Sequence, residues 1–239
     1  MNILVLGASS SIGCSIVKSF AKNNKLILLS TKHEKLETLK NETLALGSHS
    51  VNIIEADLQF PIVVMDLISE SIDMIINVAC ATPSLKNYNI EPHRHQYYTA
   101  VDLSSPLVIL EHFLKEKSKQ GESTQLYYIF INTILSKIKS PDYSIYYSYK
   151  ILQQEYMSGF QHKYGNILKS INIIVGTQIN RSKETRKTVK LAERIKLAIK
   201  NNESEFIFGP DGKIIYMLYR MSPLLSNGLI YIKRFLFRQ

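Results

Sequence analysis

Residues 2–13 read Asn-Ile-Leu-Val-Leu-Gly-Ala-Ser-Ser-Ser-Ile-Gly, an apolar run followed directly by a glycine turn. The apolar run is typical of a buried strand in a parallel sheet. After the turn, apolar side chains recur at helical spacing, at Ile12, Ile16, Val17 and Phe20. A strand, a glycine turn and a helix in this order are the context in which such a sequence predicts a dinucleotide-binding site.

The chemistry of this turn suits a pyrophosphate. Glycine permits a tight turn, the start of a helix offers unpaired N–H groups, and serine hydroxyls add further donors. The sequence therefore predicts a nucleotide site built from Gly7, Ser9, Ser10, Ser11, Ile12 and Gly13.

Further apolar runs alternate with helical patterns along the chain. The expected strands are residues 26–30, 51–56, 74–79, 127–131 and 171–175. This alternation predicts an α/β fold, a single doubly wound Rossmann-type parallel sheet with helices on both faces. No repeat or linker divides the 239 residues, so we expect one domain over residues 1–239.

A second motif lies in the middle of the chain. Thr133 precedes Tyr146 by thirteen residues, and Lys150 follows Tyr146 by four. On a helix from residue 143 to about residue 164, Tyr146 and Lys150 share one face. A nearby ammonium lowers the pKa of a phenol from about 10, which suits a general acid/base. The alternative is an exposed helix face, since the chain has 14 tyrosines.

Together these motifs resemble the short-chain dehydrogenase/reductase family over roughly residues 1–180. The family glycines match Gly7 and Gly13, but Leu6 and Ser11 depart from the pattern, and Ser11 narrows the space for the pyrophosphate. The remaining correspondences are with Asp57 and Leu58, Asn77 to Cys80, Thr133, Pro141, Tyr146, Lys150 and Val175-Gly176.

The resemblance implies a role for each matching residue. Asp57 would contact the adenine, Leu58 would also bind the cofactor, and Asn77 and Ala79 would line it. Thr133 would orient the substrate oxygen, Tyr146 would exchange its proton, and Lys150 would also contact the nicotinamide ribose. Asp102 stands where many relatives have an asparagine that holds a proton-relay water. We include it among the candidate catalytic residues.

The cofactor preference depends on the end of the second expected strand. NAD-specific relatives have an acid there, but this chain has Thr31 followed by Lys32. A hydroxyl and a cation suit a 2′-phosphate, so NADP(H) is predicted over NAD(H). The alternative is that Lys32 simply begins an exposed helix over residues 32–46.

Several other site types are not expected. Cys14 and Cys80 lie in different expected elements, which disfavours a disulfide. His93 and His95 fall in an expected loop and are not at metal-ligand spacing. No motif supports nucleic-acid binding, and no uncharged run of about 18 apolar residues is present.

The net charge of +9 is concentrated at the carboxyl end. Residues 1–180 carry 16 Lys/Arg and 15 Asp/Glu, giving +1, whereas residues 181–239 carry 13 and 5, giving +8. Residues 214–239 mix apolar and basic side chains without an acid. They could contact an anionic membrane surface, or pack over the substrate pocket or an oligomer interface. The apolar amino terminus fits a strand better than a leader, so we expect a cytoplasmic protein, with contact at the inner membrane surface as an alternative.

The expected function is an NADPH-dependent oxidoreductase acting on a small carbonyl or alcohol substrate. Two alternatives stay open: a nucleotide-binding protein without turnover, and an epimerase or dehydratase built on the same triad. The resemblance also implies a homodimer or tetramer, formed through helix residues such as Ile151, Leu152, Tyr156 and Phe160.

Overall fold

The structure is a computed structural model that describes residues 1–81, 92–120, 124–138, 144–176 and 184–222. Within these ranges all strands join one parallel sheet, in the order β3-β2-β1-β4-β5-β6-β7. The strands are β1 (Asn2–Leu6), β2 (Lys25–Ser30), β3 (Ser50–Glu55), β4 (Met74–Asn77), β5 (Leu126–Thr133), β6 (Leu168–Val175) and β7 (Glu205–Phe208). The predicted doubly wound parallel sheet is confirmed.

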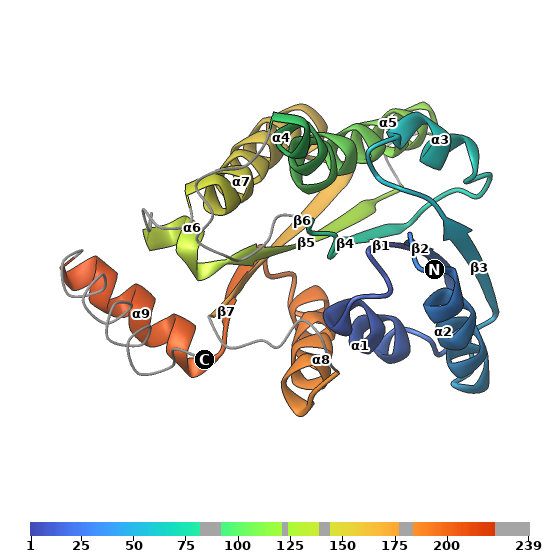
Figure 1. The fold of residues 1–239 in the computed structure, drawn as a ribbon, viewed down its shortest axis with the longest axis horizontal. Coiled ribbons are helices and arrows are strands. Elements are labelled where there is room, and N and C mark those ends of the chain that lie inside the picture. Colours follow the sequence, from blue (N-terminus) through green and yellow to red (C-terminus); the bar gives the residue numbers. More distant parts are fainter. Residues whose placement is uncertain (82–91, 121–123, 139–143, 177–183, 223–239) are drawn as a thin grey trace.

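Helices cover both faces of the sheet (Figure 1). One face carries α3 (Pro61–Asp66), α4 (Pro92–Thr99), α5 (Ser105–Gln120) and α7 (Ser144–Tyr164). The other face carries α1 (Ser11–Ser19), α2 (His33–Ala45) and α8 (Arg186–Lys200). The short α6 (Ile134–Ile138) follows β5, and α9 (Pro210–Met221) follows β7.

Alternate side chains of β1 point to opposite faces of the sheet, so this strand contributes to a hydrophobic core on each face. Leu4 and Leu6 pack on the α5 and α7 side, whereas Ile3 and Val5 pack on the α1 and α8 side. All four side chains are fully or almost fully buried. Because β1 lies in the middle of the sheet, both of its faces are covered, which explains its unbroken apolar sequence.

The strand order reverses between β1 and β4. From β1 the chain adds β2 and then β3 on one side, and from β4 it adds β5, β6 and β7 on the other. Open parallel sheets bind ligands at such a point, outside the carboxyl ends of the strands. Gly7 follows β1 directly and Val78 follows β4 directly, so both loops lie at this position.

Some local expectations were wrong. His93 and His95 lie in helix α4 and not in a loop. Pro92 supplies a favourable first helical residue, and α4 continues through a π-helical turn, η1 (Ala100–Ser104), into α5. Helix α9 begins directly after β7, with Gly209 at the N-cap with φ 95°. Strand β7 was not predicted, since only four residues at the sheet edge carry its pattern.

Candidate active site

The glycine turn after β1 requires both of its glycines. Gly7 has φ 82°, and a Cβ added there would lie 2.8 Å from the Cα of Ala79. A Cβ added to Gly13 would lie 2.6 Å from the carbonyl oxygens of Gly7 and Ala8. Side chains at these two positions would therefore push the turn away from the β4 loop and α1 away from the turn.

Helix α1 begins at the turn with its first N–H groups directed into the loop. Ser10 is the N-cap, and its hydroxyl accepts the Gly13 N–H at 3.0 Å. Ser11, the first residue of the helix, is buried. The positive end of the α1 dipole thus lies beside the Ser9 to Ser11 hydroxyls, and an anion site requires such a combination of dipole and donors.

A cleft of about 480 Å³ joins the glycine turn to the middle motif of the chain. Twelve of the predicted site residues line it: Gly7, Ser9, Ser10, Ser11, Ile12, Thr31, Lys32, Asp57, Leu58, Ala79, Tyr146 and Lys150. These residues come from the loops after β1, β2, β3 and β4, from the start of α1 and from helix α7. The fold therefore brings together segments that are up to 143 positions apart, from Gly7 to Lys150.

Four predicted site residues do not line the cleft, and they lie around it. Gly13, in α1, packs against the backbone of the glycine turn. Asn77 is the last residue of β4, and its Oδ1 accepts the Ala79 N–H of the following loop at 3.2 Å. Thr133 ends β5 and is buried, and its hydroxyl oxygen accepts the Leu135 N–H at 3.3 Å.

Asp102 lies in the π-helical turn and contacts the loop after β4. It is 1 % exposed; its Oδ1 accepts the Ala81 N–H at 2.5 Å, and its Oδ2 accepts the Cys80 thiol at 3.7 Å. Both carboxylate oxygens therefore have donors in the loop after β4, which forms one wall of the cleft and includes Cys80 and Ala81.

Helix α7 presents the tyrosine and the lysine on successive turns. The helix spans Ser144 to Tyr164, close to the predicted limits, and Tyr146 and Lys150 are both buried. The Asn132 side-chain amide, at the end of β5, donates to the Lys150 carbonyl oxygen at 3.4 Å.

The end of β2 forms the far side of the cleft. The hydroxyls of Ser9 and Ser30 are 2.5 Å apart, and the Lys32 N–H donates to the Ser30 hydroxyl oxygen at 3.2 Å. Lys35 also lines the cleft, although the sequence prediction omitted it. Its signal was available, because a residue three positions after Lys32 on a helix lies on the same side.

Other lining residues were also missed. Tyr97 and Val101 come from α4 and η1, and Ile131 comes from β5. Burial and the nearby carboxylates of Asp57 and Asp102 raise the pKa of Tyr97, which keeps this side chain a neutral phenol. No local pattern marks these residues, since Tyr97 and Val101 reach the cleft only through the packing of α4 and η1 on the sheet, and Ile131 reaches it only through the position of β5 in the sheet.

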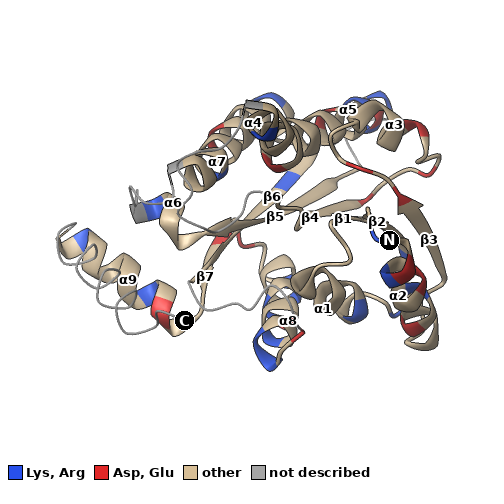
Figure 2. Ribbon diagram, in the orientation of Figure 1, with Lys and Arg blue, Asp and Glu red and all other residues tan. Residues whose placement is uncertain are grey.

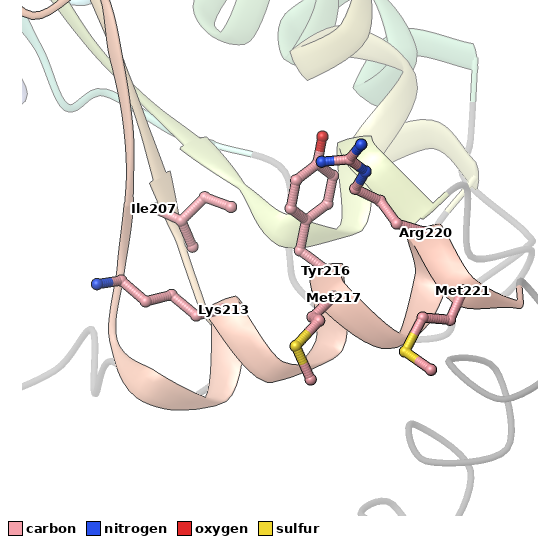
Figure 3. A pocket seen from close by; sticks show the side chains of 6 residues that line it. All are labelled: Ile207, Lys213, Tyr216, Met217, Arg220 and Met221. Carbon is pink, nitrogen blue, oxygen red and sulfur yellow. The ribbon is translucent and has the colours of Figure 1, made fainter.

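A second hollow of about 460 Å³ lies between β7 and α9 (Figure 3). Its walls are Ile207, Lys213, Tyr216, Met217, Arg220 and Met221. None of these residues lines the first cleft. Within the described ranges, no group of three metal-ligating side chains occurs, and no helix is long and apolar enough to cross a membrane.

The parallel sheet, its glycine turn and the shared cleft define a Rossmann-type nucleotide-binding protein. The close backbone packing at Gly7 and Gly13 holds the turn against the loop after β4 and against α1, which fits a pyrophosphate at the start of α1.

Comparison with known proteins identifies the family. Residues 1–187 match the family described as short chain dehydrogenase. The chain belongs to this family and is an NAD(P)-dependent oxidoreductase of the short-chain type. Among curated proteins, none matches the sequence significantly.

Many solved structures share this fold. A short-chain dehydrogenase from Sphingobium yanoikuyae, solved in complex with NADPH, has 16% identity and a TM-score of 0.75, covering 86% of this chain and 87% of that one. A bulky-bulky ketone specific alcohol dehydrogenase from Comamonas testosteroni has 15% identity and a TM-score of 0.78, covering 96% and 93%. A short-chain dehydrogenase from Streptomyces avermitilis has 16% identity and a TM-score of 0.77, covering 92% and 93%.

Proposed function

We propose that this chain is a single-domain, NADPH-preferring oxidoreductase that interconverts a carbonyl and an alcohol, with Tyr146 as the general acid/base. The observation that carries the proposal is the single cleft lined by the glycine turn, Tyr146 and Lys150. A catalytic phenol must lie where nucleotide and substrate meet, and this cleft satisfies that condition.

The residues around the cleft account for the proton chemistry. When bound, the nicotinamide cofactor supplies the hydride that the carbonyl carbon accepts. Tyr146 donates its proton to the carbonyl oxygen, and the Lys150 ammonium stabilises the phenolate that is left. The Thr133 hydroxyl oxygen accepts the Leu135 N–H, and its own proton would hydrogen-bond the substrate oxygen.

The preference for NADPH is supported by the end of β2. Thr31, Lys32 and Lys35 line the cleft beside the Ser9–Ser30 hydroxyl pair. Asp57, after β3, is the one acid among the residues that line this cleft in the described ranges. Two ammonium groups and a hydroxyl favour a 2′-phosphate electrostatically.

Replacing Tyr146 with phenylalanine tests the catalytic assignment. Reduction of a panel of ketones and aldehydes by NADPH should fall by about 10²–10⁴-fold, because the general acid is lost, while NADPH binding measured by fluorescence stays within about twofold. Tyr147→Phe is the matched control: it removes a hydroxyl from the next residue of α7, which has no lysine four positions on.

Equal turnover by Tyr146→Phe and the wild-type enzyme would rule out the proposed acid. If the wild-type protein binds NADPH and turns over no carbonyl, the alternative of a nucleotide-binding protein without turnover is favoured. The role of Asp102 in holding a relay water, and the choice between redox and epimerase or dehydratase chemistry, stay predictions.

We also propose that the chain forms a homo-oligomer through α5 and α7. Three apolar side chains on these helices are exposed, namely Val108, Leu152 and Tyr156. Ile151 and Phe160 are half-buried beside them. A monomeric mass by light scattering at micromolar concentration would contradict this proposal.

Contact with an anionic membrane surface is our proposal for α9. Ile214, Met217 and Met221 are exposed on this helix, and Lys213 and Arg220 lie among them. Such a mixture of apolar and basic side chains suits the interface of an anionic bilayer. The rest of the predicted basic segment, residues 223–239, lies outside the described residues, and a cytoplasmic location stays a prediction.

A further inference from the structure

A network of three polar side chains lies in the core between the cofactor loop and the catalytic helix. The hydroxyl oxygen of Tyr128, on β5, accepts the Asn77 Nδ2–H at 3.2 Å and the Gln153 Nε2–H at 3.2 Å. Tyr128 and Gln153 are completely buried, and Asn77 is 2 % exposed. One hydroxyl therefore connects β4, β5 and α7.

This network costs stability relative to an apolar core. Burial of a polar group is unfavourable unless its hydrogen bonds are made, and the Gln153 Oε1 is buried without a partner in the described part of the chain. Tyr128 itself does not serve as an acid or base, because burial raises its pKa far above the usual value. The Tyr128 hydroxyl is therefore explained by the two amides that it holds in position and not by proton transfer.

One end of the network supports the floor of the cofactor site. The Asn77 Oδ1 accepts the Ala79 N–H at 3.2 Å, while its Nδ2 donates to Tyr128. Ala79 lines the cleft, and its Cα would lie only 2.8 Å from a Cβ added to Gly7. A shift of the Asn77 amide thus moves the backbone on which the glycine turn rests.

The other end of the network holds the catalytic helix. Gln153 lies three residues after Lys150 and seven after Tyr146, so all three share one face of α7. Other contacts also hold this helix: Asn132 binds the Lys150 carbonyl, and the Tyr149 hydroxyl lies 3.0 Å from the Thr99 hydroxyl. The Gln153 contact ties it, through Tyr128, to the residue that supports the cofactor floor.

We propose that Tyr128 is a positioning residue whose hydroxyl sets the distance between the catalytic face of α7 and the Asn77–Ala79 floor of the nucleotide site. The inference rests on the proposed function of that cleft. Tyr128 touches neither substrate nor cofactor; it acts through Asn77 and Gln153.

The test compares Tyr128→Phe with Tyr127→Phe in the full chain. Each variant loses one hydroxyl from β5, but Tyr127 belongs to the core on the opposite face of the sheet. Well below the unfolding temperature, Tyr128→Phe should raise the NADPH dissociation constant about tenfold and lower kcat about tenfold, a size expected for one lost core hydrogen bond. Hydrogen–deuterium exchange in α7 should rise, and Tyr127→Phe should show none of these changes.

A double variant separates positioning from stability. Tyr128→Phe leaves two buried amides without an acceptor, and adding Gln153→Met removes one of them at similar volume. We expect Tyr128→Phe/Gln153→Met to regain part of the lost unfolding temperature while its NADPH affinity stays weak, because α7 and Asn77 remain disconnected. Recovery of wild-type affinity in the double variant, or unchanged affinity in Tyr128→Phe, would overturn the inference. NADPH affinity is measured without turnover, so this result stands apart from a failure to find a carbonyl substrate.

Discussion

Thr31 occupies the position that we propose selects between the two nicotinamide cofactors. It follows the last residue of β2 and lines the cleft with Lys32 and Lys35. A carboxylate there would hydrogen-bond the free ribose hydroxyls and repel a 2′-phosphate. A hydroxyl has no such repulsion, and the neighbouring ammonium groups attract the phosphate. The proposed selectivity therefore depends on the electrostatics of a few exposed side chains.

Thr31→Asp should reverse the cofactor preference. We expect the ratio of NADPH to NADH affinity to fall by at least about tenfold, since the new charge disfavours phosphate and pairs with ribose hydroxyls. Thermal-shift titration provides the measurement, because a ligand at 100 times its dissociation constant stabilises by about 2.7 kcal/mol. Thr38→Asp adds the same charge to an exposed position of α2 away from the cleft. An unchanged ratio in Thr31→Asp would exclude this position from cofactor selection.

Asp73 holds three elements together at the amino-terminal edge of the sheet. Its Oδ2 accepts the Asn2 N–H of β1 at 2.9 Å, and its Oδ1 binds the Lys117 ammonium of α5 at 3.0 Å. Lys117 is 5 % exposed. Burial by itself would raise the pKa of Asp73, but the Asn2 N–H and the Lys117 ammonium outweigh it, and the pKa lies below its ordinary value.

The lowered pKa predicts acid-sensitive packing of β1, β4 and α5. The contribution of Asp73 to stability is complete above its unfolded pKa of about 3.9 and disappears as pH falls through the lower folded value. Asp73→Asn should lower the free energy of unfolding by about 1–3 kcal/mol at pH 7, since it leaves a buried ammonium without its anion. Urea denaturation should show the difference shrinking below about pH 4. Asp66→Asn, at an exposed site of α3, should change stability little at either pH.

Over the whole molecule, the net positive charge lies mainly in the carboxyl-terminal part of the chain. The excess of +8 in residues 181–239 lies partly on α8 and α9 (Figure 2). On α9, Met217 and Met221 project from the same side (Figure 3), and both are more than half exposed. The opposite side of α9 buries Ile215 in the cluster that contains Tyr146. The helix thus packs one face in the core beside Tyr146 and exposes Met217 and Met221 on the other.

Charge and apolar exposure together predict binding to anionic vesicles. The wild-type chain should sediment with vesicles rich in phosphatidylglycerol and not with pure phosphatidylcholine, and added salt should weaken the binding. Met217→Glu/Met221→Glu should reduce the bound fraction severalfold without changing NADPH affinity. Ile62→Glu/Val63→Glu makes the same change at exposed sites of α3 and serves as the control. If both double variants bind equally well, α9 is not the contact surface.

Patterns over a few neighbouring residues were sufficient for the fold class and for the candidate site list. Strand β1, the glycine turn and α1 are encoded within the first 20 positions, and α7 was predicted within one residue of its ends. Periodicity, glycine conformation and i,i+4 spacing depend only on nearby positions, so they can be read directly from the sequence. The short β7 and helix α4 were missed because neither carries a long periodic pattern.

Contacts between distant segments were decided only by the tertiary structure. Gly7 must be glycine because Ala79 packs against it, 72 positions away. Asp102, expected to hold a water, directs both of its oxygens to the loop at Cys80 and Ala81. The Tyr128 hydroxyl reaches Asn77 and Gln153 only because β4, β5 and α7 pack side by side. Each of these contacts depends on how the sheet orders its strands and how closely the helices pack, and no short stretch of sequence carries that information.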